Sequence, residues 1–354
     1  MPPSFSDFRS DTVTRPTPAM RAAMAGAEVG DDVYGEDPTV RQLEEATAKR
    51  LGHEAGLFVP SGTQGNQIAV GVFCRPGDEV LLDANSHGVH YEGGATAALW
   101  GAQIYPLPSP RGILNEAQVR AAIRPDDDHA PRSRLLMLEN THNRGGGAVW
   151  PLEAFRRVVQ AAREHRLNVH LDGARLWNAE VATGAPARSW AELSDSATVS
   201  FSKGLGAPVG AVLVGSRAFI HEGRRLRKRL GGGMRQAGIV AAGALYALEH
   251  HVARLAEDHR HARLLAEGLA ALPGVAVDLA RVETNMVYAD FPCPAPRAVA
   301  SLRALGVLGH AVGPTTLRFV CHLDVGAEDV RRALEAAGRL VADVAEEGLG
   351  TSGT

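Results

Sequence analysis

The chain has 354 residues, a formal net charge of −3, and proportions of hydrophobic (45%) and charged (22%) residues that are ordinary for a globular protein. This small net charge gives no reason to expect nucleic acid or an anionic membrane as a partner, and no apolar run approaches the ~20 residues of a transmembrane helix. The first residues lack a signal-peptide pattern, and three widely spaced cysteines are typical of buried thiols in a reducing compartment. We therefore expect a cytoplasmic protein.

The pattern along the chain predicts an α/β protein. Residues 1–40 are polar and contain prolines, so we expect this segment to lie as an arm over another surface. A helical pattern begins at Thr39, and helical stretches such as 152–165 separate many of the strand-like runs that follow. Strands that alternate with helices are typical of a largely parallel sheet. The seven strand-like runs are 56–60, 80–83, 104–107, 135–139, 168–172, 197–201 and 211–214.

A long helical region, expected to bend, extends from Gln236 to Leu272. The shorter helical and strand-like patterns beyond it predict a small α+β domain. We therefore expect a large domain over 1–246 that includes the N-terminal arm, a small C-terminal domain over 247–345, and a flexible tail over 346–354.

Two of the predicted strands end near an acid and an amine. The run 168–172 ends at Asp172, before Gly173, and the run 197–201 is followed by Lys203. Because open α/β proteins bind ligands at the carboxyl edge of the sheet, we expect these two side chains to converge there. Pyridoxal 5′-phosphate (PLP) requires such a pair: a lysine that forms a Schiff base and an acid that keeps the pyridine nitrogen protonated. The alternative is a surface lysine and a helix-capping aspartate.

The segment Ser61–Asn66 follows a strand and opens an apolar helix. Free backbone N–H groups and the positive helix end suit a phosphate at this position. Gly62 allows close approach of the anion, and Ser61 or Thr63 can add a hydroxyl. Helix capping alone would also explain the Ser and Thr residues.

Three further groups are candidates for binding or proton transfer. His87 follows the run 80–83, where a planar ring could stack on the cofactor. A zinc site formed by His87 and His90 with His142 or His170 would contain no cysteine, and we expect no metal. His142 follows another strand and precedes a glycine-rich loop. It could exchange a proton with a substrate hydroxyl, or it could order the loop.

Cationic groups are available for the anionic parts of a ligand. The basic run 224–229 precedes a glycine-rich segment that opens a helix, so it could neutralise a phosphate. A solvated basic face is the alternative for Arg224, Arg225 and Arg227. Arg318 lies in a strand-like run of the C-terminal part, where its guanidinium could bind a carboxylate in bidentate fashion.

Five segments together resemble the low-specificity L-threonine aldolases, which are PLP-dependent enzymes of the beta-eliminating lyase/threonine aldolase family. The resemblance extends from about residue 7 to about residue 345. It implies the aspartate-aminotransferase-like fold (PLP fold type I), with a mostly parallel seven-stranded sheet in the large domain and a small C-terminal α+β domain. The segments are FRSDTVT at 8–14, VGDDVYG at 29–35, HLDGAR at 170–175, SKGLG at 202–206 and GGGMRQ at 231–236.

The resemblance also implies residue roles. Lys203 would carry the Schiff base, Asp172 would pair with the ring nitrogen, and His87 would stack on the ring. Lys228 and Arg235 would reach the phosphate from a neighbouring subunit. The expected catalytic residues are Lys203, His87, His142 and Asp172. The expected cofactor-binding residues are Ser61, Gly62, Thr63, His87, Asp172, Arg175, Ser202, Lys203, Lys228 and Arg235. The expected substrate-binding residues are Ser10, His142, Arg175 and Arg318.

The implied reaction is the retro-aldol cleavage of L-threonine or L-allo-threonine, and of other L-3-hydroxy-α-amino acids, to glycine and an aldehyde. The alternatives are another PLP-dependent β-eliminating lyase, another 3-hydroxy-amino-acid aldolase such as phenylserine aldolase, or a non-catalytic PLP-binding protein. The resemblance also implies a homotetramer (a dimer of dimers) with shared active sites, and a role in threonine catabolism and glycine biosynthesis. Gly88 departs from the family pattern, because relatives often carry a bulkier residue after the stacking histidine.

Overall fold

The computed structural model describes residues 5–350, without the side chains of 348–350. The described chain forms two units. Residues 16–252 form the large unit, and residues 5–15 together with 253–350 form the C-terminal unit. Among the described helices, none combines the length and the apolar character that crossing a membrane requires.

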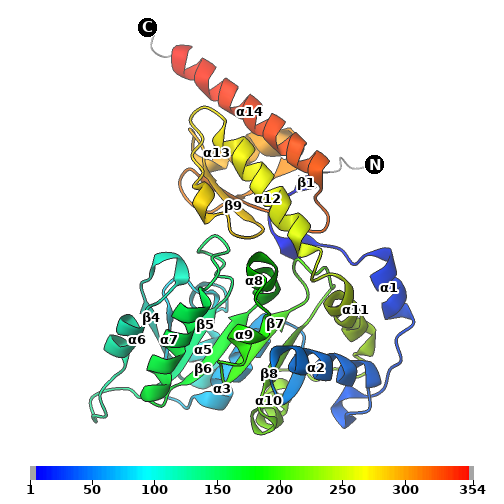
Figure 1. Cartoon of the computed structure of the whole chain (residues 1–354), viewed down its shortest axis with the longest axis vertical. Coiled ribbons are helices and arrows are strands. Elements are labelled where there is room, and N and C mark those ends of the chain that lie inside the picture. Colours follow the sequence, from blue (N-terminus) through cyan, green and yellow to red (C-terminus); the bar gives the residue numbers. More distant parts are fainter. Residues whose placement is uncertain (1–4, 351–354) are drawn as a thin grey trace. The chain divides into compact units, whose positions relative to one another are not determined.

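The centre of the large unit is a seven-stranded sheet with the strand order β2-β8-β7-β6-β5-β3-β4 (Figure 1). All seven predicted strands are present, and only β8 runs antiparallel to its neighbours, so the predicted mostly parallel sheet is confirmed. The strands are β2 (Ala55–Val59), β3 (Glu79–Asp83), β4 (Gln103–Leu107), β5 (Ser133–Glu139), β6 (Asn168–Gly173), β7 (Ser196–Ser200) and β8 (Ala211–Gly215).

Helices cover this sheet (Figure 1), and the strands β3, β7 and β8 are therefore buried along their whole length. The helix α7 shows how the sequence achieves this, since Phe155, Val158, Val159 and Ala162 recur at helical spacing and are all buried. The α-helices of the unit are α1 (Pro18–Ala25), α2 (Pro38–Leu51), α3 (Gly62–Phe73), α4 (His87–His90), α5 (Ala95–Trp100), α6 (Glu116–Ala122), α7 (Leu152–Glu164), α8 (Leu176–Thr183), α9 (Arg188–Ala191), α10 (Arg217–Arg229) and α11 (Gly238–His250).

The parallel strands bring polar residues to one edge of the sheet. β3 ends at Asp83, β5 ends at Glu139, and Asp172 lies opposite Glu139 in the register of β6 with β5. β7 ends at Ser200, shortly before Lys203 in sequence. Three neighbouring strands and β7 therefore deliver carboxylates and an amine to the same edge, as the sequence predicted for Asp172 and Lys203.

The predicted basic run lies in α10, and two of its arginines pair with buried acids. The buried Arg227 guanidinium lies 2.6 Å from Oδ2 of the buried Asp32. Arg224 forms an ion pair with the carboxylate of Glu44, which is also buried. The solvated-face interpretation is therefore wrong for Arg227, which is buried, whereas Arg224 pairs with a buried acid but keeps 40% of its side chain exposed, and Arg225 is exposed.

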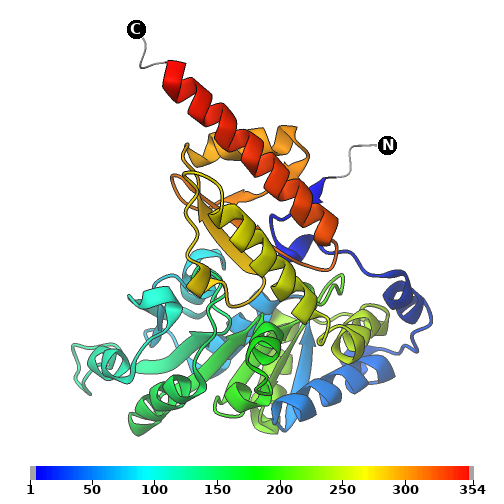
Figure 2. The same cartoon turned by 45° about the horizontal axis from the view of Figure 1, so that its top comes forward.

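The C-terminal unit has its own apolar core and a three-stranded antiparallel sheet in the order β11-β12-β9. β1 (Ser6–Asp7) pairs in parallel with β10 (Val307–Leu308), and Phe8 is fully buried against the ring of Phe319. Figure 2 shows α12 packed beside α14 in this unit. The remaining elements are β9 (Met286–Asp290), β11 (His310–Ala311), β12 (Thr316–Val320), α12 (Leu255–Ala270), α13 (Ala295–Ala304) and α14 (Ala327–Gly350).

The structure differs from the predicted domain ranges at both ends of the chain. Residues 5–15 pack with the C-terminal unit because Phe8 belongs to its core, although they were predicted as part of the domain 1–246. The predicted long helix is broken into α11 and α12, close to the boundary between the units. Residues 346–350 of the predicted tail are helical in α14, and residues 351–354 lie outside the described residues.

Candidate active site

Asp172 is buried at the carboxyl edge of the sheet and accepts two hydrogen bonds. Asn66 Nδ2 donates to its Oδ2 at 2.8 Å, and the backbone N–H of Ala174 donates to its Oδ1 at 3.0 Å. Burial alone would raise the pKa of this carboxyl, but His87, Lys203 and the hydrogen bonds lower it. The structure therefore brings Asp172 and the half-buried Lys203 into electrostatic contact, with the acid in its ionised form.

The first turn of α3 lies at the same edge. Ser61 is the N-cap residue of α3, and its hydroxyl accepts the backbone N–H of Gln64 at 3.1 Å. A Cβ atom at Gly62 would lie 3.0 Å from Oγ of Ser200, so a larger residue would crowd the end of β7. Because the Ser61 hydroxyl already caps the helix, the backbone N–H groups of the first turn and the hydroxyl of Thr63 are the donors suited to a phosphate.

His87 begins α4 and is held at two points. Its Nδ1 lies 2.8 Å from Oε1 of Glu92, and its backbone N–H donates to Oε2 of Glu139 at 2.7 Å. The side chain is 29% exposed, and its Nε2 has no hydrogen-bond partner in the described part of the chain. Burial alone would lower the pKa of His87, but the carboxylates of Glu92, Asp172 and Glu139 raise it.

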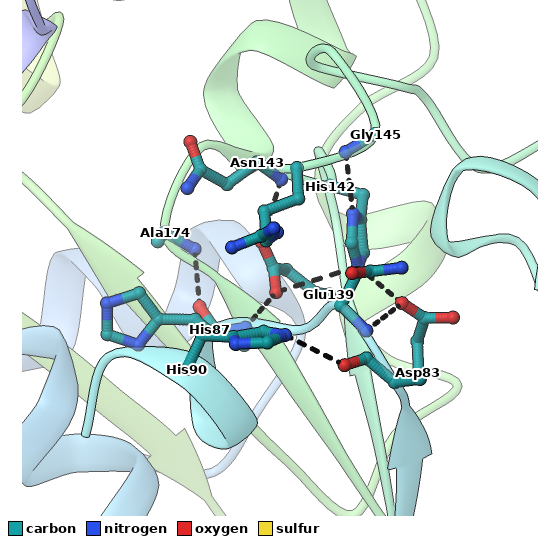
Figure 3. Close-up of polar contacts among 12 residues, drawn as sticks. Asp83, His87, His90, Glu139, His142, Asn143, Gly145 and Ala174 are labelled. Carbon is teal, nitrogen blue, oxygen red and sulfur yellow. Dashed lines mark hydrogen bonds and ion pairs between the residues drawn. The ribbon is translucent and has the colours of Figure 1, made fainter. Parts of the chain in front are cut away.

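His142 is enclosed by residues from three segments of the chain. Its side chain is 1% exposed, its Nδ1 accepts the backbone N–H of Gly145 at 3.0 Å, and its Nε2 lies 3.2 Å from Oδ1 of Asp83 (Figure 3). Gly112, with a left-handed φ of 83°, packs against the imidazole ring so closely that a Cβ atom would clash with it. Both ring nitrogens face protein partners, so the geometry favours the loop-ordering interpretation of this residue.

Glu139 joins the two segments that carry these histidines (Figure 3). Its Oε2 accepts the backbone N–H of His87, and its Oε1 accepts the backbone N–H of Asn143 at 2.8 Å. From the sequence, Glu139 was recognised only as the last residue of a strand. Its function as a bridge depends on two loops that the sequence pattern does not bring together.

Asn66, Gln67 and Glu92 were also missed by sequence reasoning. Glu92 is buried and accepts hydrogen bonds from Asn66 Nδ2 at 2.9 Å and from Gln67 Nε2 at 2.6 Å. A signal was available, because two adjacent amides in an otherwise apolar helix need buried polar partners. The sequence could not identify Glu92 as that partner.

The other predicted site residues of the large unit are less directly connected to Asp172 and His87. Arg175 is buried, and its Nη1 lies 3.4 Å from Oδ1 of Asn143. Ser202 is half-buried beside Lys203. The glycine-rich segment after α10 packs against the first turn of α3, where Gly232 contacts the side chain of Gln64.

Lys228 and Arg235 flank this glycine-rich segment, and both are exposed. The Arg235 guanidinium lies 2.9 Å from Oδ2 of Asp31. This contact uses the Nη1 atom of Arg235, and the Arg235 side chain remains 57% exposed.

Ser10 and Arg318 belong to the C-terminal unit and lie close together there. Arg318 is in β12, and its Nη2 donates to the backbone carbonyl of Arg9 at 3.0 Å. The Ser10 hydroxyl accepts the backbone N–H of Thr12 at 3.2 Å. Within this unit, the structure therefore brings two of the predicted substrate-binding residues into one neighbourhood.

The zinc set considered from the sequence is not assembled. Among the residues that the structure describes, only His87, Glu92 and Asp172 place three potential ligand atoms within 4.8 Å of one another. His142 and His170 are fully buried, and their ring nitrogens face other partners. The carboxylates near His87 accept hydrogen bonds from amides instead.

Comparison with known proteins identifies the family of this chain. The family model described as beta-eliminating lyase matches residues 7–292. The chain is 45% identical over 342 residues to the probable low-specificity L-threonine aldolase 2 of Arabidopsis thaliana, covering 93% of this chain and 95% of that protein. It is 43% identical over 326 residues to the low specificity L-threonine aldolase of Escherichia coli K12, covering 92% and 96%.

A solved structure of Leishmania major threonine aldolase has a TM-score of 0.83 at 23% identity and covers 95% of this chain and 99% of its own. The predicted fold, that of the type I PLP enzymes, is therefore confirmed. The chain thus belongs to the beta-eliminating lyase family and, within it, to the low-specificity L-threonine aldolases.

Proposed function

We propose that this protein uses PLP to cleave L-threonine, L-allo-threonine and other L-3-hydroxy-α-amino acids to glycine and an aldehyde. The observation that carries the proposal is the buried, ionised Asp172 in electrostatic contact with Lys203 at the carboxyl edge of the sheet. The family to which the chain belongs and the names of its relatives support the same reaction.

The residues present fit PLP. The ionised carboxylate of Asp172 suits a protonated pyridine nitrogen, and the amine of Lys203 suits the aldehyde of the cofactor. The first turn of α3, kept open by Gly62 next to Ser200, suits the phosphate. When bound, PLP supplies an electron sink for the electron pair of the cleaved bond between Cα and Cβ.

The chain's own residues would bind the substrate and accept its hydroxyl proton. Arg318, with Ser10 and Arg175, would bind the α-carboxylate and so orient the bond to be cleaved. The candidates for the base are His142, His87 and a bound water. The geometry favours His87, because its side chain is 29% exposed and its Nε2 has no hydrogen-bond partner among the described residues, whereas both nitrogens of His142 face protein partners.

Incubation with each threonine diastereomer separately tests the reaction. We expect glycine and acetaldehyde in equal amounts, measured by amino-acid analysis and by an aldehyde-coupled assay. Formation of a 2-oxo acid and ammonia would instead establish a β-eliminating lyase. Turnover of β-phenylserine without turnover of either threonine would establish a phenylserine aldolase, and no turnover of any 3-hydroxy amino acid would favour a non-catalytic PLP-binding protein.

The proposal extends to assembly and cellular role. The phosphate of PLP carries about two negative charges, and a helix N-terminus offers about half a positive charge, so cations are required nearby. Lys228 and Arg235 are exposed and would supply these charges to a neighbouring subunit of a homotetramer, a dimer of dimers. The enzyme would act in the cytoplasm in threonine catabolism and glycine biosynthesis.

Mixing two inactive variants tests the shared site. Lys203→Ala and Arg235→Ala are combined under conditions that allow subunits to exchange. If Arg235 serves the partner's site, each hybrid dimer contains one site with both changes and one intact site. Activity should then return to roughly a quarter of wild type, since about half of randomly paired dimers are hybrids. Confirmed exchange without recovered activity would show that both residues serve the same chain.

A further inference from the structure

We propose that Glu92 is a positioning residue that fixes the tautomer of His87, leaving Nε2 as the ring nitrogen that accepts the proton of the substrate hydroxyl. The inference rests on the proposed function for the identity of the proton donor. The hydrogen bonds that set the tautomer are formed between residues of this chain and involve neither cofactor nor substrate.

Glu92 is placed to accept hydrogen bonds only. Its side chain is completely buried, and its Oε1 accepts Asn66 Nδ2 at 2.9 Å while its Oε2 accepts Gln67 Nε2 at 2.6 Å. His87 Nδ1 lies 2.8 Å from the same Oε1. Because an ionised carboxylate has no proton to donate, Nδ1 must carry the hydrogen in this contact. In the neutral ring, Nε2 is then unprotonated and able to accept a proton.

The orientation of Asn66 supports this assignment. One amide N–H of Asn66 donates to Glu92 and the other to Asp172, so its Oδ1 is left to face His170 Nε2 at 3.1 Å. Burial lowers the pKa of His170 to about 4, which keeps this ring neutral and allows its Nε2 to donate while Nδ1 accepts from the Ser196 hydroxyl at 2.8 Å. Every donor in this chain of contacts meets an acceptor.

Asn66 therefore links Glu92 to the acid proposed to pair with the cofactor. A displacement of Glu92 would disturb both His87 and Asp172, because one amide holds the two carboxylates. This explains why a polar residue occupies a buried position of α3.

The charged groups around His87 would balance the product of proton transfer. As the proton leaves the substrate oxygen, its bonding electron pair stays on that oxygen, the Nε2–H bond forms, and the ring becomes an imidazolium. Glu92 faces the ring at Nδ1, and Asp172 from β6 and Glu139 from β5 add negative charge nearby. The ring of Tyr91 also packs against the imidazole, with the two ring centroids 5.5 Å apart, and Lys203 acts on the same cluster through Asp172.

His142 has the opposite arrangement. The backbone N–H of Gly145 donates to its Nδ1, so its neutral ring carries the proton on Nε2, which faces Asp83. The two imidazoles of the site are therefore predicted to be opposite tautomers, which provides an internal comparison in one sample.

Nitrogen-15 NMR of the cofactor-free, full-length wild-type protein tests the tautomer directly. At a pH above the pKa of His87, we expect a protonated Nδ1 and an unprotonated Nε2 for His87, and the reverse for His142. The resonances are assigned with His87→Gln and His142→Gln variants. A His87 ring protonated on Nε2 overturns the inference, whether or not the enzyme cleaves threonine. Conversely, failure of the proposed function would leave this measurement unchanged.

Glu92→Gln tests the role of the charge, with Glu79→Gln as a matched control. Glu79 is another fully buried carboxylate that accepts side-chain hydrogen bonds. It begins β3, whereas the candidate active site lies at the other end of that strand, next to Asp83. In Glu92→Gln, the imidazolium loses its counter-charge, so His87 should titrate at a lower pH than in wild type. In Glu79→Gln, the titration of His87 should not change.

In the PLP-loaded enzyme, Glu92→Gln should move the acidic limb of the kcat/KM profile to lower pH. It should also lower kcat by roughly 10- to 100-fold, within the range that a general base contributes, with little change in KM. A merely structural effect of Glu92 would lower activity without moving the limb. An unmoved limb, or an equal shift in Glu79→Gln, contradicts the inference.

Discussion

Replacement of Lys203 by alanine is expected to lower threonine cleavage by about a thousandfold or more, because the covalent attachment of the cofactor is lost. The chain has only three lysines, Lys49, Lys203 and Lys228, so the site of attachment can be determined without ambiguity. Borohydride reduction of the PLP-loaded wild type should modify one lysine, in the tryptic peptide that contains Lys203, as measured by mass spectrometry. The yellow colour of the purified protein should disappear on reduction.

Lys49→Ala is the matched control for this experiment. Lys49 is exposed at the end of α2, and its replacement should leave both the labelling and the activity unchanged. Label on Lys49 or Lys228 in the wild type would refute the assignment of Lys203. Full activity of Lys203→Ala would also refute it.

Arg318→Lys is expected to lower kcat/KM for threonine by about 100-fold while PLP remains bound. Lysine keeps the positive charge but loses the planar fork that binds both oxygens of a carboxylate, and a hydrogen bond to a charged group contributes about 1.5–3 kcal/mol. In the structure, the Arg318 guanidinium is also oriented by its hydrogen bond to the Arg9 carbonyl, which one ammonium group would not reproduce together with carboxylate binding. Steady-state kinetics and the cofactor absorption spectrum are the measurements.

Arg297→Lys is the control in the same unit. Arg297 is paired with Glu347 near the end of α14, and its replacement should not affect kinetics. Near-normal turnover of Arg318→Lys would mean that another residue binds the substrate carboxylate. Loss of cofactor from Arg318→Lys would indicate a structural effect in place of a substrate-binding one.

The sequence was sufficient to predict the large sheet and the carboxyl edge of the sheet as the place where a ligand would bind. Each strand is a short run of apolar residues, some of them alternating with polar ones, and is followed by a polar or glycine-containing turn. These local patterns place Asp172 near the end of β6 and Lys203 after the neighbouring strand β7. The order of alternating strands and helices then favours a largely parallel sheet, in which the carboxyl ends of neighbouring strands meet at one edge. The resemblance to a known family added roles for residues such as Arg318, which no local pattern assigns.

The tertiary structure decided which histidine is accessible. From the sequence, His142 was the first candidate for exchanging a proton with the substrate hydroxyl, and His87 was expected to stack on the cofactor ring. His142 is enclosed because Asp83, Gly112 and Gly145, which come from three different segments, surround its ring. A contact of this kind leaves no periodic signal in the sequence.

The same reason explains the other differences between what the sequence predicts and what the structure shows. The sequence by itself determined the strands, the helices and the acid–amine pair, because hydrophobic periodicity and turn residues act over a few neighbouring positions. Only the tertiary structure decided that Phe8 joins the core of the C-terminal unit, that Arg227 pairs with Asp32, and that Asn66 holds Glu92. Buried polar groups must find partners, but those partners come from distant segments that meet only when the chain is folded.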